Sequence, residues 1–217
     1  MWIHSPVHRL LRGKKHLLLT GYLLIGLGLG WLGRPAPAHG QTSTHTLYLP
    51  LVMRSESTAC QPLTPQEQAV LDKMRSDPNQ GRQAFNCDPI LQRVARERAQ
   101  DMGLRNYCSH INPDGYGPNY LVRQAGYPLP TWYGQEAGAN NIESIACYAS
   151  STLSDWQSVS VTIWQNWMAS EEHRVHLLGL NNFYAEQTDY GIGYANLPGE
   201  GWAYRSYWVV ITARRGP

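Results

Sequence analysis

The sequence predicts a mixed fold in which helices cover an antiparallel sheet. Three observations indicate it: helix-start signals precede segments with helical apolar spacing, alternating strand-like segments lie between and after them, and the last two strand-like segments are joined as in a hairpin. A chain of 217 residues is long enough for one domain with a hydrophobic core. We place that domain at residues 60–215.

Two helices are expected at the start of the domain. The segment TPQE at 64–67 has the form of a capping box with proline in the first helical position, and it predicts a helix to about residue 75. After a loop, the dipeptide DP at 88–89 opens a second helix that ends near 103–106. Its buried face is expected to comprise Leu91, Val94, Ala95, Ala99 and Met102, with the aliphatic stem of Arg98.

The rest of the domain is expected to alternate between helices and strands. Residues 111–118 are turn-rich, and a short helix at 118–125 ends at Gly126. Residues 142–148 alternate like a half-buried strand. A third long helix follows, and a further helical turn or two at 171–178 stops at Gly179. The third helix is expected to bury Val159, Ile163, Trp164 and Trp167.

The two strands expected at the C-terminal end form a hairpin. They are GIGYA at 191–195 and YRSYWVVITA at 204–213, and the loop NLPGEGWA joins them.

The N-terminal segment 1–38 has the features of an export signal. A basic stretch is followed by the apolar run 17–33 and then by the small-residue motif Ala36-Pro37-Ala38. We expect cleavage after Ala38, with an uncleaved N-terminal anchor as the alternative. Residues 39–59 are polar and read as a linker, with room for one short strand.

Export changes the charge balance of the chain. Five of the 18 basic residues precede position 39, which leaves 13 basic and 16 acidic side chains in the exported part. A net charge of about −3 does not favour nucleic-acid binding. We therefore expect no nucleic-acid partner, and membrane contact only through an uncleaved anchor.

Four cysteines remain in the exported part. An even number in an exported chain indicates two disulfides, for which three connectivities exist. We favour Cys60–Cys87 and Cys108–Cys147. Because the chain has no C-x-x-C motif, it predicts neither a zinc knuckle nor a thioredoxin-type redox pair.

Only three histidines lie in the predicted domain: His110, His173 and His176. His110 precedes a glycine-containing turn, and His173 begins a helical turn after Ser170. Loop and strand-end positions of this kind often carry function. The carboxylates that could join them are Asp114, Glu143, Glu171 and Glu172.

Five stretches, taken in order over residues 64–213, resemble a known family. They are FNCDPILQRVARERAQDM (85–102), CSHINPDG (108–115) with RQAGY (123–127), ESIA (143–146), WMASEEHRVHLL (167–178), and FYAEQTDYGIGYA with YWVVITA (183–195 and 207–213). The chain resembles the SCP domain of the CAP superfamily (cysteine-rich secretory proteins, antigen 5 and pathogenesis-related proteins) in its bacterial secreted form.

The resemblance implies an α+β fold, a three-layer α–β–α sandwich with a central antiparallel sheet. It also implies a cleft that holds His110, His173 and Glu143, with Asp114 and Glu172 as the first candidates for a fourth member. An alternative register would place Asn140 at the acidic position. The chain departs from the family pattern at three positions: Ser144 and His176 each replace an asparagine, and Cys87 replaces an aromatic residue.

Two imidazoles with one or two carboxylates could hold a divalent metal such as zinc. The ligands we assign to such a metal are His110 and His173. His173 and His176 share a helical face, so this pair is the alternative, but the resemblance places only His173 in the cleft.

Nothing in the sequence compels catalysis, and we commit no catalytic residue. Ser109 neighbours His110, but consecutive residues of an extended segment point to opposite faces. The motifs G-x-S-x-G and H-E-x-x-H are absent. We expect a secreted or cell-surface protein that binds an extracellular ligand or protein, lipid-like or not, in the His/Glu cleft. A metal-dependent hydrolase or peptidase that uses the same cleft is the alternative.

Overall fold

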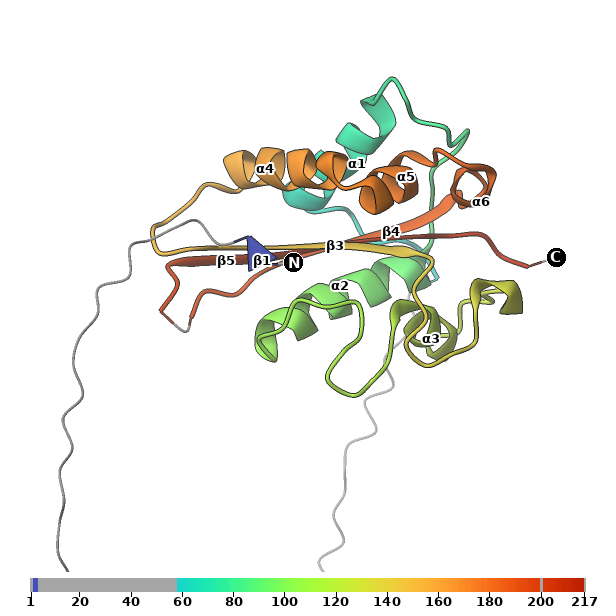
Figure 1. Ribbon diagram of the computed structural model, residues 1–217, viewed down its shortest axis with the longest axis horizontal. Coiled ribbons are helices and arrows are strands. Elements are labelled where there is room, and N and C mark those ends of the chain that lie inside the picture. Colours follow the sequence, from blue (N-terminus) through green and yellow to red (C-terminus); the bar gives the residue numbers. More distant parts are fainter. Residues whose placement is uncertain (1, 4–57, 200, 217) are drawn as a thin grey trace, which may run out of the picture. The chain divides into compact units, whose positions relative to one another are not determined.

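The computed structural model describes residues 2–3, 58–199 and 201–216. In this part of the chain a sheet lies between two helical layers, as Figure 1 shows. The predicted α+β sandwich is therefore confirmed. The helices are α1 (Pro65–Ser76), α2 (Pro89–Leu104), α3 (Pro118–Gln124), α4 (Trp156–Ala169), α5 (Glu171–Leu178) and α6 (Asn182–Ala185), with a 3-10 turn at Thr131–Tyr133.

The sheet has the strand order β1-β3-β5-β4-β2, and its three long strands are antiparallel. β5 lies at the centre and pairs with β3 on one side and with β4 on the other, which confirms the C-terminal hairpin. Two-residue strands pair in parallel at both edges. The strands are β1 (Trp2–Ile3), β2 (Asn86–Cys87), β3 (Glu143–Ser150), β4 (Asp189–Asn196) and β5 (Tyr204–Ala213).

The helix ends follow the predicted signals. The capping box of Thr64 and Glu67 is formed at the start of α1, and the Asp88 side chain accepts hydrogen bonds from two backbone N–H groups of α2. Ser170 has extended dihedral angles, so α4 and α5 are separate helices that change direction there. Gly179 ends α5 in the left-handed conformation (φ 59°), as glycine allows without strain.

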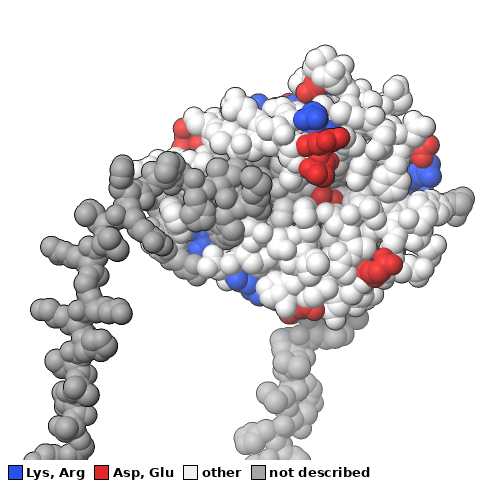
Figure 2. Space-filling view, in the orientation of Figure 1, with Lys and Arg blue, Asp and Glu red and all other residues white. Residues whose placement is uncertain are grey.

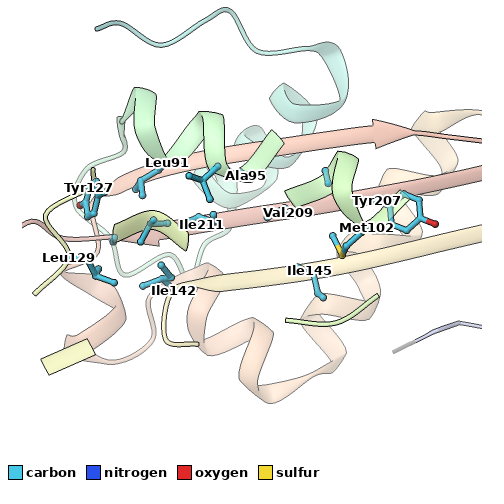
Figure 3. Close-up of a cluster of buried hydrophobic side chains, with 14 of the residues drawn as sticks. Leu91, Ala95, Met102, Tyr127, Leu129, Ile142, Ile145, Tyr207, Val209 and Ile211 are labelled. Carbon is cyan, nitrogen blue, oxygen red and sulfur yellow. The ribbon is translucent and has the colours of Figure 1, made fainter. Parts of the chain in front are cut away.

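One layer of the core lies between α2 and the sheet. Figure 3 shows Leu91, Ala95 and Met102 of α2 among side chains from β3 and β5. The helix approaches β4 very closely, because a Cβ atom added at Gly193 would lie 2.2 Å from the carbonyl oxygen of Ala95. Gly193 therefore allows α2 to pack directly against the backbone of β4.

The other layer packs α1, α4 and α5 on the opposite face of the sheet (Figure 1). The predicted stripe of α4 is buried at Val159, Ile163 and Trp167, whereas Trp164 is only partly buried. The indole N–H of Trp167 donates a hydrogen bond to the carbonyl oxygen of Ile145, which fastens α4 to β3.

Two disulfides join Cys60 to Cys87 and Cys108 to Cys147, as predicted. The second ties the loop that carries His110 to β3. Of the N-terminal segment, the structure describes the strand pairing of residues 2–3 and residues 58–59. The predicted signal or anchor at 1–38 and the linker at 39–59 otherwise lie outside the described residues. Among the helices that are described, none has the length and apolarity needed to span a bilayer.

Candidate functional site

A pocket of about 400 Å³ lies where β3 begins and α5 passes over the sheet. Consecutive residues of a strand point to opposite faces, so Glu143 is directed toward α2 while Ser144 is directed toward α5. The pocket therefore collects side chains from both helical layers. Those that bear on its chemistry are His110, Glu143, Ser144, Glu172, His173 and His176.

Glu143 is the anchor of the site, because its side chain is fully buried and both carboxylate oxygens are paired. Arg98 of α2 donates to them from Nε at 3.0 Å and from Nη2 at 3.2 Å, and His110 donates from Nδ1 at 2.9 Å. Burial alone would raise the pKa of Glu143, but the charge of Arg98 and the bonds from His110 and Arg98 outweigh it and lower the pKa. The carboxylate is thus held ionised inside the protein.

Arg98 also fixes the loop that carries His110. Its Nη2 donates to the carbonyl oxygens of Ser109 and His110, and its Nη1 donates to the hydroxyl of Tyr107 at 2.7 Å. The apolar spacing of α2 predicted only a packing role for the aliphatic stem of Arg98. The charged group is itself buried, and the signal for this was a permanent charge on the apolar face of a helix.

His173 faces His110 across the pocket, with 6.5 Å between the ring centroids. Ser170, the residue between α4 and α5, accepts from His173 Nδ1 at 2.9 Å and donates to Glu172 at 3.0 Å. Burial and the neighbouring His110 both lower the pKa of His173. The structure thus brings together His110, Glu143, His173 and Glu172 around one pocket.

The hydrogen bonds determine which nitrogen of each of these two rings carries its proton. A carboxylate only accepts, so His110 must donate from Nδ1. Ser170 gives its one hydroxyl proton to Glu172, so His173 must also donate from Nδ1. In their neutral forms both rings therefore keep a lone pair at Nε2, and within the described residues no side chain or backbone group occupies either Nε2.

His176 has a different environment and belongs to the floor of the pocket. It is buried beneath Ser144, whose Oγ lies 2.7 Å from Nδ1, and its Nε2 lies 2.8 Å from Thr212 Oγ1. Both ring nitrogens are engaged, so His173 and His176 do not form a free chelating pair. From the sequence His176 was only the alternative metal ligand beside His173, and the structure shows its actual partners.

The structure places the other acidic candidates outside the pocket. Asp114 is half exposed and forms an ion pair with Arg105 at 2.8 Å in a separate depression beside α2. Its proposed place in the cleft is therefore corrected, because the turn after His110 directs it toward the surface of α2. Glu171 is exposed. Asn140 lines the pocket, but its side chain bonds to the backbone of residues 142 and 143, so it orders the start of β3 rather than replacing Glu143.

The pocket has the donor types of a metal site but not a complete set. Within the described residues, no three or more His, Cys, Asp or Glu side chains are arranged to hold a metal ion. Glu143 is already committed to Arg98 and His110. A cation would therefore have two protein ligands, Nε2 of His110 and Nε2 of His173, and would complete its coordination with other molecules.

The face drawn in Figure 2 is mostly uncharged; one group of acidic side chains forms a short stripe near the middle, and others lie singly around it. The basic side chains on this face are scattered and form no broad patch among the residues described.

No protein-family model matches the chain, and no curated protein matches it. Two solved structures are similar. An outer surface protein from Borrelia burgdorferi is 15% identical with a TM-score of 0.43, over 69% of this chain and 90% of that one. An extracellular protein containing an SCP domain from Bacillus anthracis str. Ames is 22% identical with a TM-score of 0.43, over 71% of this chain and 45% of that one. At these values neither similarity decides the family or the function of this chain.

Proposed function

We propose that this chain is a secreted CAP-like protein that binds a small polar ligand in its His/Glu pocket, together with a divalent cation such as zinc. One observation carries the proposal: two imidazoles from opposite layers of the sandwich face each other, and each offers an Nε2 lone pair to the same pocket. When bound, the cation would attract and polarise an oxygen or nitrogen atom of the ligand.

The protein supplies the orientation of the two ligands. Glu143 fixes the ring of His110, and Arg98 keeps Glu143 ionised. Ser170 fixes the ring of His173 by its hydrogen bond to Nδ1, and Glu172 in turn orients the Ser170 hydroxyl. A carboxylate behind an imidazole raises its basicity as a ligand and sets its tautomer, which favours binding of a cation at the opposite nitrogen.

The lining supports a polar ligand better than a lipid-like one. Besides the imidazoles and carboxylates, the lining includes the amide side chains of Asn140 and Asn141, and its apolar members are Ile142 and Tyr184. Sites for lipids are lined mainly by apolar and aromatic side chains. The two disulfides support a compartment outside the reducing cytosol, in keeping with the signal-like segment at 1–38.

The test is calorimetric titration of chelator-treated protein with zinc at pH 7. We expect one site in the parent protein and at least about a tenfold loss of affinity in His110→Ala and in His173→Ala, because losing even a group that only orients a ligand costs about 10–100-fold. Glu171→Gln is the control, because this carboxylate lies on α5 but outside the pocket, and it should bind like the parent. Parent protein without a zinc site, or equal affinity in all variants, would refute the proposal. Turnover of ester or peptide substrates that is lost with the same histidines would favour the hydrolase alternative.

A further inference from the structure

Two of the positions at which the chain departs from the family it resembles are in direct contact. Ser144 of β3 and His176 of α5 are 32 residues apart in sequence, yet Ser144 Oγ lies 2.7 Å from His176 Nδ1. Both side chains are almost fully buried and both line the floor of the pocket. The hydrogen bonds continue from this pair through Thr212 of β5 to Gln187, and together they form a buried network across the sheet.

The donor and acceptor in each hydrogen bond of this network can be assigned by starting from Gln187. The amide N–H of Gln187 donates to the carbonyl oxygen of Asn141, so its Oε1 accepts from Thr212 at 2.7 Å. Thr212 has then used its only proton, and it must accept from His176 Nε2–H at 2.8 Å. The neutral ring of His176 therefore has its lone pair at Nδ1, and the hydroxyl of Ser144 donates to it.

The surroundings keep this ring neutral. Burial lowers its pKa well below the ordinary value, and the buried guanidinium of Arg82 adds to the effect. Arg82 donates to the carbonyl oxygens of His176 and Leu177 at the C-terminal end of α5, and to Thr212 Oγ1. Among the described residues no carboxylate contacts His176, so a protonated ring would have no partner of opposite charge.

These contacts argue against a catalytic serine. A nucleophilic Ser144 would have to pass its proton to His176, and the resulting imidazolium would be buried beside Arg82. In a catalytic triad a carboxylate stabilises that imidazolium, and here the corresponding group is the neutral hydroxyl of Thr212.

The contacts fit a role in positioning. α5 has eight residues and no side-chain hydrogen bond at its N-cap, because Ser170 is occupied by His173 and Glu172. The helix is fastened instead near its C-terminal end, by His176 to two strands and by Arg82 to its last carbonyl groups. His173 lies one turn before His176, so its place over the pocket depends on that fastening.

We propose that Ser144 and His176 are positioning residues that hold α5 against β3 and β5 and thereby set the separation of the His173 and His110 imidazoles. Both ring nitrogens of His176 and the hydroxyl proton of Ser144 are used within this network, so we place the pair behind the ligand of the pocket. This inference rests on the proposed function for its effect on zinc affinity, but its structural part can be measured without a metal.

The experiment compares Ser144→Ala with Ser206→Ala. Both remove one hydroxyl that is buried in the sheet and hydrogen-bonded to a ring nitrogen, that of His176 in the first case and that of Trp208 in the second. Ser206 pairs with Tyr148, far along β3 from Glu143, and does not line the pocket. The two variants should lose similar stability, so a difference in binding reports position rather than folding.

We expect zinc affinity to fall about tenfold in Ser144→Ala, the lower end of the range for groups that orient metal ligands, and less than twofold in Ser206→Ala. Equal affinities in the two variants would overturn the inference. If the parent protein binds no zinc, the proposed function fails, and two metal-free measurements still decide the inference. Long-range ¹H–¹⁵N NMR should show the Nε2–H tautomer for His176. The nuclear Overhauser effects between the ring protons of His110 and His173 should change in Ser144→Ala and stay unchanged in Ser206→Ala. An Nδ1–H tautomer, or ring contacts unchanged in both variants, would refute it.

Discussion

Glu143→Gln removes the charge at the centre of the site. In the parent protein this carboxylate is fully buried and accepts three hydrogen bonds, two from Arg98 and one from His110. The glutamine has nearly the same shape but leaves the Arg98 guanidinium, which is 3% exposed, without a counter-charge. We expect a large loss of stability, because the uncompensated charge stays inside the protein.

The contacts of Arg98 set the size of the loss. Removing one partner of a buried ion pair costs about 3–5 kcal/mol. Arg98 keeps its bonds to Tyr107 and to two carbonyl oxygens, and the glutamine keeps one acceptor, so the lower end of about 3 kcal/mol is expected. For a domain of this size that corresponds to a fall in Tm of roughly 6–12 °C.

Urea denaturation at pH 7 followed by tryptophan fluorescence, with a thermal scan beside it, measures the effect. Glu186→Gln is the matched control, since Glu186 pairs with Arg214 and both side chains are about half exposed. An exposed pair contributes about 0–1 kcal/mol. A loss below 1 kcal/mol in Glu143→Gln, equal to the control, would refute the argument that the buried pair organises the site.

The pH dependence gives a second check on the same variant. The folded-state pKa of Glu143 lies below its unfolded value, so its contribution is present above the unfolded pKa of about 4.3 and is lost as the pH falls through the folded-state pKa. The stability of Glu143→Gln should therefore fall less steeply below about pH 4.3 than that of the parent. Parallel curves would show that the carboxylate is not stabilised by folding.

Three further predictions concern the frame of the pocket. The double variant Cys108→Ala/Cys147→Ala removes the covalent link between the His110 loop and β3. The free energy of unfolding measured in urea should fall by about 2–4 kcal/mol, and zinc affinity should fall with it. Unchanged affinity would show that the disulfide does not hold the site. Gly193→Ala places a methyl group against the backbone of α2 and should lower Tm by several degrees or prevent folding, whereas a neutral effect would contradict the close packing. Because the pKa of His176 is lowered in the folded state, the unfolded chain binds a proton at this residue first as the pH falls below about 6.5. This residue should lower stability there by up to ~1.4 kcal/mol per pH unit, and His176→Asn should remove that share of the slope and leave the share of His173, whose pKa is also lowered.

Local signals predicted most of the fold. The capping box at Thr64 and the Asp88-Pro89 start indicated the first two helices, and the alternating apolar residues indicated β3 and the hairpin of β4 and β5. These signals depend on neighbours within a few residues, which a sequence displays directly. The break at Ser170 was not predicted, since serine is also tolerated inside helices and no local signal marked its extended dihedral angles.

The site was predicted in part. The resemblance gave His110, Glu143 and His173, which the structure brings together, but it gave Asp114 as well, which lies elsewhere. Arg98 was missed because apolar spacing describes its stem and does not reveal whether its charge is buried. The partnership of Ser144 with His176 joins residues distant in sequence, so no local pattern could indicate it.

Anomalous diffraction from crystals soaked in zinc, recorded at the zinc absorption edge, would locate the proposed cation directly. We expect one strong peak in the pocket, within about 2.0–2.1 Å of Nε2 of His110 and of Nε2 of His173, with the Arg98–Glu143 pair unchanged. A peak at His176, or an empty pocket at a zinc concentration that fills other surface sites, would contradict the proposal.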